Sequence, residues 1–388
     1  MSAVVQQLVV HTVRVPLRRP FVTAVRRATE LEVCLVEARD ADGRSGWGEA
    51  ACSWRVTGES AGSVRAAVDG PLSEAVYGLG LDDWDRVDAA IVRALWGNAA
   101  ARSAVDCALH DLAAQQAGQS LAAFLSPGVA LSPEALRTDM TLSAAPTAEL
   151  VEQALAHVAD GFTSLKVKVG GGFDDLAALP ALRSALGEGI ALRADANQGW
   201  DVATAIATIR HWEDAGACLE FVEQPVAATQ LEELAQIRRA VSTPLMADES
   251  VRITADIHRL VALNAVDLVN VKLAKSGGLS EARRMVTVAA EHGLSVMVGS
   301  MLESSVGLAA AAALALTLPA LTLPGAGAAQ DLDAATWLWN SPVTGGLLCE
   351  GTTLVPSARP GLGILGLASG DVESGDVVSV DLERSPRG

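Results

Sequence analysis

The stretch Leu192-Arg-Ala-Asp-Ala-Asn-Gln-Gly-Trp200 places Asp195 at the end of a short apolar run, just before a polar turn. Glu223, followed by Gln-Pro, and Asp248, followed by Glu-Ser, end two later runs of the same form. Glu223 lies 28 residues after Asp195 and Asp248 lies 25 after Glu223, about the length of one strand-helix unit. Three successive strands would each offer a carboxylate at the C-terminal end, which suggests a metal site.

Two lysine-bearing runs flank these carboxylates. Lys166 and Lys168 lie one unit before Asp195, and Lys272 lies one unit after Asp248. Because alternate residues of a strand share a face, Lys166 and Lys168 point the same way, which in a closed barrel can be inward. Burying lysine is unfavourable unless its charge is used, so these positions indicate function.

The chain alternates strand and helix from residue 139. Strands are expected near 140–142, 164–169, 190–195, 218–223, 245–248, 268–273 and 295–298, and helices at 147–160, 174–186, 202–215, 231–241, 254–263 and 279–292. This alternation implies a parallel sheet, and carboxylates at successive strand ends favour a closed barrel over a doubly wound sheet. The apolar segment 306–323 is expected to be a buried barrel helix, because Thr and Pro interrupt it.

Residues 1–125 lack this rhythm and are expected to form an α+β capping domain. Its antiparallel strands would cover 4–15, 31–38 and 45–49, and its helices 60–75, 82–95 and 99–117. The barrel would span 126–339, and the Gly-, Pro- and Ser-rich tail, about 340–388, would return to the cap. Loops at 20–29 and 54–60 carry arginines that could reach a neighbouring active site.

Composition excludes several classes of partner. The net charge is −17 with no basic run, so neither nucleic acid nor an anionic membrane is expected as a partner. No signal peptide is seen. Five cysteines without a CxxC spacing indicate reduced thiols in a cytoplasmic protein.

Three carboxylates from adjacent strands suit Mg²⁺, which takes oxygen ligands and leaves positions for substrate oxygens. The alternative is that they only cap the following helices. Lys168 and Lys272 would be the acid and the base if their pKa values were lowered, and a divalent cation and burial both act in that direction. The alternatives for a barrel lysine are a salt bridge or a Schiff base.

Several motifs follow one another along the chain: Gly46-Trp-Gly-Glu49, Lys166-Val-Lys168, Asp195-Ala-Asn, Glu223-Gln-Pro, Asp248-Glu-Ser, Lys272 and Lys275-Ser-Gly-Gly. In this order they resemble the enolase superfamily, specifically its muconate lactonizing enzyme subgroup. The resemblance implies a modified (β/α)7β TIM-like barrel with an N-terminal capping domain. It also implies one Mg²⁺ per active site, held by Asp195, Glu223 and Asp248.

The same resemblance assigns roles to the lysines. It implies Lys168 and Lys272 as the two acid/base groups and Lys166 as a supporting cation near the substrate carboxylate. The mandelate racemase branch is disfavoured, because it uses a histidine late in the barrel and residues 295–298 contain none.

The stretch Gln330-Asp-Leu-Asp333, at the expected eighth strand, indicates which of the reactions of this subgroup the chain catalyses. Asp331 and Asp333 alternate onto one face and could bind an α-ammonium group. In this the chain resembles the dipeptide epimerases, whose Asp-x-Asp motif holds the substrate amine. The alternative is that Asp333 is only the N-cap of a helix.

The residues that choose the substrate side chains are less clearly marked. Arg26 matches the position at which Ala-Glu epimerases pair an arginine with the substrate glutamate, and the alternative is a solvated loop arginine. Thr141, Ser300 and Met301 match family positions that line the substrate cavity.

The sequence therefore predicts a cytoplasmic, Mg²⁺-dependent dipeptide epimerase that transfers a proton at the α-carbon of the C-terminal residue through a metal-stabilised enediolate. A homo-oligomer is expected, because barrels of this family commonly assemble. The alternatives are an o-succinylbenzoate synthase or N-acylamino acid racemase, a muconate-type cycloisomerase, and a non-catalytic metal-binding relative.

Overall fold

The computed structural model describes residues 4–22, 27–127, 135–318 and 329–368. Its centre is a curved sheet of seven parallel strands in the order β11-β10-β9-β8-β7-β6-β5. The strands are β5 (Met140–Leu142), β6 (Ser164–Lys168), β7 (Ala191–Asp195), β8 (Leu219–Glu223), β9 (Leu245–Ala247), β10 (Leu268–Lys272) and β11 (Ser295–Gly299). Each lies within a residue or two of its expected place.

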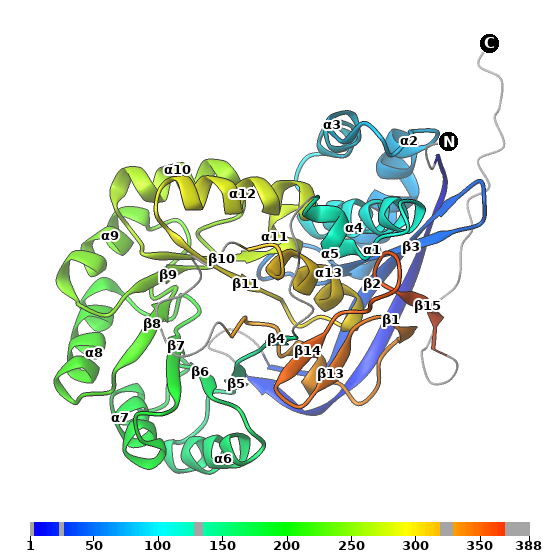
Figure 1. Ribbon diagram of the computed structural model, residues 1–388. Helices are drawn as coiled ribbons and strands as arrows, with labels where there is room; N and C mark the ends of the chain where they lie inside the picture. Colours follow the sequence, from blue (N-terminus) through cyan, green and yellow to red (C-terminus); the bar gives the residue numbers. More distant parts are fainter. Residues whose placement is uncertain (1–3, 23–26, 128–134, 319–328, 369–388) are drawn as a thin grey trace.

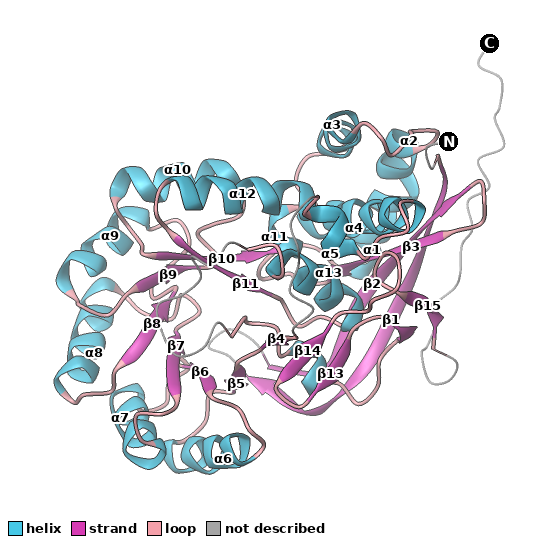
Figure 2. Cartoon of the chain, in the orientation of Figure 1, coloured by secondary structure: helices cyan, strands magenta, loops and turns pink. Residues whose placement is uncertain are grey.

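Helices follow these strands and cover the outside of the sheet (Figures 1 and 2). They are α6 (Thr147–Ala159), α7 (Asp175–Leu186), α8 (Val202–Asp214), α9 (Leu231–Ala240), α10 (Thr254–Leu263), α11 (Leu273–Ser276), α12 (Leu279–Glu291) and α13 (Ser305–Ala315). Every side chain of α13 is buried, as expected of a barrel helix. No helix in the described ranges is long and apolar enough to span a membrane.

The eighth barrel position is held by single bridges rather than by a strand. Gln330 bridges to Thr138 beside β5, and Asp331 bridges to Gly299 at the end of β11, so the segment joins the two edges of the sheet. The expected strand over 330–333 is therefore shorter than predicted. The reason is that Asp333 already has helical dihedrals (φ −79°, ψ −5°) and leads into η2 (Ala334–Trp337).

Strand alternation sorts the barrel residues by polarity. The outward residues are apolar and pack beneath the helices, as Val167 and Ala194 do. The inward residues at the C-terminal ends are charged, whereas Phe221, Met246 and Met297 form a small apolar cluster with Leu268. The helices bury the outer face of the curved sheet, and the sheet encloses its own inner face. The charged groups are therefore gathered in the barrel interior.

The cap precedes the barrel in the chain. Its antiparallel sheet, in the order β1-β2-β3, comprises β1 (Val5–Val22), β2 (Arg27–Asp40) and β3 (Ser45–Ala51). Its helices are α1 (Ala61–Ala67), η1 (Val68–Leu72), α2 (Ser73–Val76), α3 (Trp84–Ala94), α4 (Ala99–Gln116) and α5 (Leu121–Leu125). The single helix expected over 60–75 is divided because Pro71 lies inside it, where it removes a backbone donor.

The C-terminal segment adds short strands beside the cap and the start of the barrel. They are β12 (Val343–Gly345), β13 (Leu348–Glu350), β14 (Thr353–Val355) and β15 (Ile364–Leu367), with β4 (Leu136–Arg137) paired to β14. The backbone N–H of Leu362 donates to the Asp111 carboxylate of α4, 2.7 Å away. The described part of the C-terminal segment therefore contacts α4.

Glu49 at the end of β3 joins the cap to the barrel. Its buried carboxylate accepts hydrogen bonds from the Ser304 amide (2.8 Å), the Ser304 hydroxyl (2.5 Å) and the Gly307 amide (2.9 Å). These donors surround the N-terminus of α13, where a negative charge is favoured. The contact fixes the cap over the C-terminal ends of the strands.

Two glycines of β3 allow the cap sheet to approach α4. A Cβ added to Gly48 would lie 2.0 Å from the Ala104 carbonyl oxygen, and one added to Gly46 would lie 2.2 Å from that of Ala108. The clash involves backbone atoms, which cannot rotate away. Glycine is therefore required at both positions.

We predict that Gly48→Ala lowers the free energy of unfolding by about 1–3 kcal/mol, the usual range for overpacking a core. The measurement is thermal unfolding followed by circular dichroism. Gly62→Ala in α1 is the matched control, because its added Cβ meets no atom closer than 3.8 Å and alanine favours the helix. An unchanged Tm for Gly48→Ala would contradict the close packing.

Candidate active site

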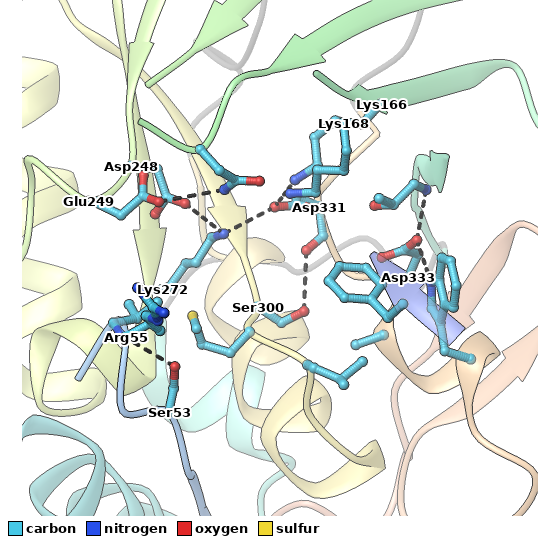
Figure 3. Close-up of a pocket in the computed structure, with 18 residues that line it drawn as sticks. Ser53, Arg55, Lys166, Lys168, Asp248, Glu249, Lys272, Ser300, Asp331 and Asp333 are labelled. Carbon is cyan, nitrogen blue, oxygen red and sulfur yellow. Dashed lines mark hydrogen bonds and ion pairs between the residues drawn. The ribbon is translucent and has the colours of Figure 1, made fainter. Parts of the chain in front are cut away.

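A pocket lies at the C-terminal ends of the barrel strands, beneath the cap (Figure 3). Its lining includes most of the residues predicted from the sequence: Thr141, Lys166, Lys168, Asp248, Lys272, Ser300, Met301, Asp331 and Asp333. Asp195 and Glu223 do not line it; both are fully buried behind Lys168 and Lys166, which contact them at 2.5 Å and 3.5 Å respectively. Arg26 lies outside the described residues.

Lys168 and Lys272 enter the pocket from opposite sides of the barrel. Lys168 ends β6 and Lys272 ends β10, four positions apart in the sheet order. With residues 330–331 in the eighth position, four steps cross the barrel. A molecule bound between these lysines would present a different face to each.

The three predicted metal ligands lie between the lysines. Lys168, Asp195 and Glu223 are neighbours in strand register, and Asp248 follows directly after β9. Lys168 Nζ lies 2.5 Å from an Asp195 oxygen, and Lys272 Nζ lies 3.0 Å from an Asp248 oxygen. Each proposed acid/base lysine is thus paired with one of the carboxylates.

The bonding of these carboxylates fits a divalent cation. Glu223 Oε2 is buried without a hydrogen-bond partner, as are Asn197 Oδ1 and Glu249 Oε2 in the loops that follow β7 and β9. Burial, and then the charge of Asp195, raises the pKa of Glu223 to about 7. Carboxylate and amide oxygens are the ligands Mg²⁺ prefers, so the donor set fits this ion in its chemistry. Among the described residues, however, Asp195, Glu223 and Asp248 do not each bring an oxygen within 4.8 Å of the other two, whereas Asp139, Asp331 and Asp333 do.

The electrostatics of Lys272 differ from the sequence expectation. Burial by itself lowers the pKa of Lys272, but the carboxylates of Asp248 and Asp331 outweigh it, so the pKa lies above its ordinary value. Of the two influences named from the sequence, burial does lower the pKa of Lys272, and the neighbouring carboxylates act against it. Burial by itself would raise the pKa of Asp248. Lys272 and Lys275 outweigh it and hold the pKa of Asp248 well below its usual range.

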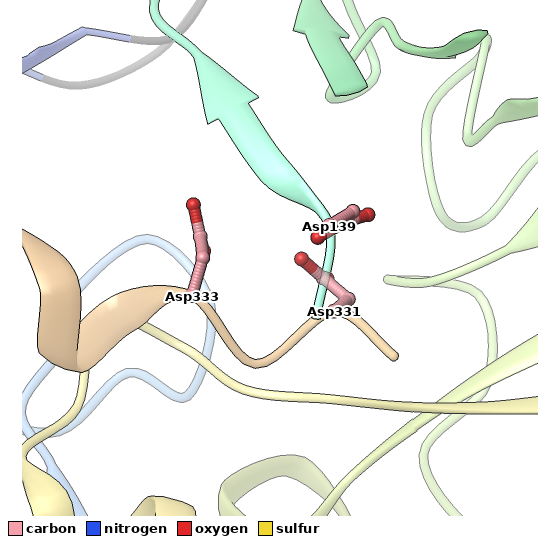
Figure 4. Close-up of side chains that lie close together, drawn as sticks. All are labelled: Asp139, Asp331 and Asp333. Atoms are coloured by element: carbon pink, nitrogen blue, oxygen red, sulfur yellow. The ribbon is translucent and has the colours of Figure 1, made fainter. Parts of the chain in front are cut away.

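A second carboxylate group, Asp139, Asp331 and Asp333, lies across the pocket (Figure 4). One oxygen of each lies within 4.8 Å of the others, so the group could hold a metal ion. The protein already supplies it with cations: Lys166 Nζ lies 2.6 Å from Asp331, and Arg193 donates to Asp139 over 2.8 Å. These two cations pair with Asp331 and Asp139, so the group needs no metal ion, while Asp333 has only the two neutral donors described below.

Lys166 links the two carboxylate groups. Besides Asp331, its Nζ lies 3.5 Å from Glu223 and 3.9 Å from Asp195. Burial lowers its pKa, but Asp331 and the other surrounding carboxylates raise it well above the ordinary value. Lys166 is thus a permanently charged group at the base of the pocket.

Asp333 precedes η2, but its side chain makes no capping hydrogen bond. Its Oδ2 accepts instead from the Thr141 amide (2.8 Å) and from Trp337 Nε1 (3.0 Å). Asp333 therefore occupies the N-cap position of η2, as the alternative proposed, but its side chain does not cap the helix. Both donors engage Oδ2, which directs the carboxylate toward the pocket.

Sequence reasoning missed several lining residues, including Ser53, Val56, Asn197, Glu249, Leu302 and Trp337. Glu249 follows Asp248 directly and Asn197 lies two residues after Asp195, so their place at the strand ends was a usable signal. Arg55, in a cap loop named as able to reach the site, does line the pocket. Arg27 is exposed.

The lysine content of the chain has a simple pattern. It contains four lysines against 25 arginines, and all four, Lys166, Lys168, Lys272 and Lys275, are at most 7% exposed. Arginine provides every other basic side chain apart from histidine. An ammonium group, which can change its protonation state more readily than a guanidinium group, is thus reserved for this site.

Comparison with known proteins agrees with this geometry. Residues 5–126 match the mandelate racemase / muconate lactonizing enzyme N-terminal domain, and residues 149–365 match the enolase C-terminal domain-like family. The chain belongs to the mandelate racemase / muconate lactonizing enzyme family. Members of the family with solved structures share this capped half-barrel.

Within this family the chain is similar to dipeptide epimerases. It is 36% identical to the L-Ala-D/L-Glu epimerase of Bacillus subtilis over 92% of this chain and 95% of that protein. The solved structure of that enzyme, a substrate-liganded complex, has a TM-score of 0.88 over 94% of this chain and 99% of the other. The Cytophaga hutchinsonii dipeptide epimerase, complexed with Mg and D-Ala-L-Val, also has a TM-score of 0.88, with 30% identity over 97% and 100% of the chains.

Mg²⁺ is predicted to raise the Tm of this family member. A ligand that binds only the folded state stabilises it by about 2.7 kcal/mol at 100 times its Kd, which is a shift of several degrees. Glu223→Gln should lose most of this shift, because it removes a charged ligand. Differential scanning calorimetry with and without Mg²⁺ measures the effect.

Glu232→Gln in α9 is the matched control, because Glu232 is exposed on the outside of the barrel. It should keep the full Mg²⁺ shift. An equal shift in Glu223→Gln and in the unchanged protein would place the ion elsewhere, with the Asp139 group as the next candidate.

Proposed function

We propose that this protein is a Mg²⁺-dependent dipeptide epimerase that inverts the α-carbon of the C-terminal residue. The observation that carries the proposal is the placement of Lys168 and Lys272 on opposite strands, on either side of three carboxylates. Inversion requires that a proton leave one face of the α-carbon and that another arrive at the opposite face. Two lysines facing each other across one pocket suit this task.

Mg²⁺ would be held by Asp195, Glu223 and Asp248. When bound, it supplies positive charge that stabilises the negative charge developing on the substrate carboxylate as the α-proton leaves. Lys166, buried beside Asp195 and Glu223, would add a second positive charge near that carboxylate.

The two lysines exchange roles with the direction of reaction. The neutral lysine removes the α-proton from its own face, and the protonated lysine gives a proton to the other face. Both ammonium groups are paired with carboxylates of the proposed metal site, so each side chain is already directed toward the reacting centre. The cap covers the pocket and limits its access to water.

Asp331 and Asp333 would bind the α-ammonium group of the substrate. They line the side of the pocket formed by the bridging segment, together with Phe21 and Trp337. Thr141, Ser300 and Met301 would complete the substrate cavity. A free amine is present in dipeptides and absent from succinylbenzoate, muconate and N-acylamino acids.

One relative keeps a second candidate open. The chain is 30% identical, over 77% of its length, to the N-succinyl-L-Arg/Lys racemase of Bacillus cereus, whose substrates have no free α-amine. The acidic pair Asp331 and Asp333 disfavours that reading. The intact lysines and carboxylates disfavour a non-catalytic relative.

Further aspects belong to the same proposal. We place the enzyme in the cytoplasm, supported by five cysteines that are all free, and expect a homo-oligomer, as is common in the family. We divide the chain into a cap of residues 1–125 with the tail from about 340, and a barrel of 126–339.

A screen of L,L-dipeptide pools in D₂O with Mg²⁺ tests the proposal. An epimerase adds one deuterium at the C-terminal α-carbon, which mass spectrometry detects. Incorporation confined to a few dipeptides would support the proposal and identify the preferred side chains. No incorporation by folded, Mg²⁺-loaded protein would favour the N-acyl or succinylbenzoate reaction.

Replacing either acid/base lysine should abolish epimerisation. Lys168→Ala and Lys272→Ala are each expected to lower kcat by at least about 100-fold, the usual contribution of a general acid or base. Exchange of the α-proton with solvent should survive from one epimer only, a different one in each variant, and proton NMR in D₂O follows it. The chain has four lysines, so each variant keeps three. NMR of ¹³C-labelled lysine can then show whether these three side chains resonate as they do in the unchanged protein, which checks that the site is otherwise intact. Undiminished turnover would contradict the two-lysine mechanism.

Removing the charge of Asp333 should weaken binding of the substrate amine. Asp333→Asn is predicted to raise KM for a free dipeptide by about 10- to 100-fold, since a hydrogen bond to a charged group contributes about 1.5–3 kcal/mol. The same variant should treat an N-acetylated dipeptide much as the unchanged enzyme does. If the unchanged enzyme prefers the acetylated substrate, the acidic pair does not bind an amine.

A further inference from the structure

Lys275 is the one lysine of the four that has no role in the proposed reaction. It lies in α11, just after β10, and is 2% exposed. It does not line the pocket, unlike Lys166, Lys168 and Lys272. A buried ammonium group is unfavourable unless its surroundings compensate the charge, so those surroundings should explain its presence.

The Lys275 ammonium group lies among four oxygen atoms. It donates to Asp248 Oδ1 and to the Asp248 carbonyl oxygen, and it lies 3.2 Å from the Val251 carbonyl and 3.3 Å from that of Asn270. We call these four atoms the oxygen cage. A compact ammonium with three donors can serve oxygens on several sides, whereas a guanidinium donates within one plane.

The cage connects a proposed metal ligand to two parts of the barrel. Its oxygens come from Asp248 at the end of β9, from the loop that follows, and from Asn270 in β10. Lys275 therefore fixes both the backbone and one carboxylate oxygen of Asp248. The other oxygen, Oδ2, lies 3.0 Å from Lys272 Nζ on the pocket side.

This arrangement separates the two oxygens of Asp248. Oδ1 is engaged by Lys275, away from the pocket, so it cannot rotate into the pocket without leaving a buried ammonium unpaired. Oδ2 stays available to the pocket. A partner that orients a metal-binding carboxylate typically changes metal affinity by 10- to 100-fold when removed.

We propose that Lys275 is a positioning residue that orients Asp248 for cation binding, with its ammonium group acting as a fixed internal cation in the oxygen cage. The proposal rests on the Mg²⁺ site of the proposed function. It concerns a residue that contacts neither the substrate nor the reacting atoms.

Titration calorimetry of the full chain with Mg²⁺ tests this role without reference to activity. Lys275→Met is expected to weaken Mg²⁺ binding by about 10- to 100-fold, and Lys275→Arg should not restore it, because the guanidinium does not fit the cage. Arg239→Met on the outside of α9 removes an exposed positive charge and is the matched control. It should bind Mg²⁺ as the unchanged protein does.

Chemical rescue distinguishes positioning from a general loss of structure. Lys275→Ala should regain much of its Mg²⁺ affinity in ethylammonium, which can fill the cage and donate to it. Tetramethylammonium, which cannot donate, should have no effect. Should Lys275→Met prove unstable, this comparison on Lys275→Ala decides the question.

Two results would overturn the inference. One is equal Mg²⁺ affinity in Lys275→Met and the unchanged protein; the other is a loss in folded Lys275→Ala that ethylammonium does not reverse. If the unchanged protein itself does not bind Mg²⁺, the metal site of the proposed function fails, and the role of Lys275 fails with it. The unchanged protein is therefore titrated first.

Discussion

The structure depends on the mutual neutralisation of charges buried inside the barrel. Lys166, Lys168, Lys272 and Lys275 each lie within 4 Å of a buried carboxylate. Removing such charges from water is unfavourable, and a buried ion pair is often no more stabilising than apolar side chains of similar size. A network of this size is therefore better explained by function than by stability.

The parallel barrel makes such a network possible. Every strand ends at the same rim, so side chains far apart in the chain converge, and inward and outward residues alternate along each strand. The outer face can then be wholly apolar, as Val167 and Val271 are beneath the helices, while Lys166 and Asn270 point inward. The cap completes the site from outside, anchored by Glu49 at the N-terminus of α13.

The two carboxylate groups have different electrostatic surroundings. The group on β7, β8 and β9 has a buried oxygen without a hydrogen-bond partner, Glu223 Oε2, and two lysines that a cation could replace as partners. In the group around Asp331, Lys166 pairs with Asp331 and Arg193 pairs with Asp139, while Asp333 accepts only from the Thr141 amide and Trp337. In the proposed function both ligands are cations, the metal ion on one side and the substrate ammonium group on the other, which explains why acidic residues lie on both sides of one pocket.

The sequence by itself determined the periodicity and the chemistry. Regular spacing of Asp195, Glu223 and Asp248 was sufficient to predict strand ends, because a strand-helix unit has a narrow range of lengths. The sequence did not determine how the barrel ends. The expected strand over 330–333 is cut short, because Asp333 already has helical dihedrals and leads into η2. The sheet is closed by bridges from Gly299 and Thr138 to this segment. Such pairings join residues far apart in the chain, so the conformational preferences of neighbouring residues do not predict them.

Tertiary structure alone decided how the charges are paired. The sequence indicated that burial and a divalent cation would lower the lysine pKa values, but only the fold shows Asp248 and Asp331 close enough to Lys272 to raise its pKa. The oxygen cage of Lys275 likewise combines carbonyl groups from separate segments, and backbone carbonyls have no signature in a sequence. Coulomb energies depend on distances between side chains, and these distances exist only once the barrel has closed.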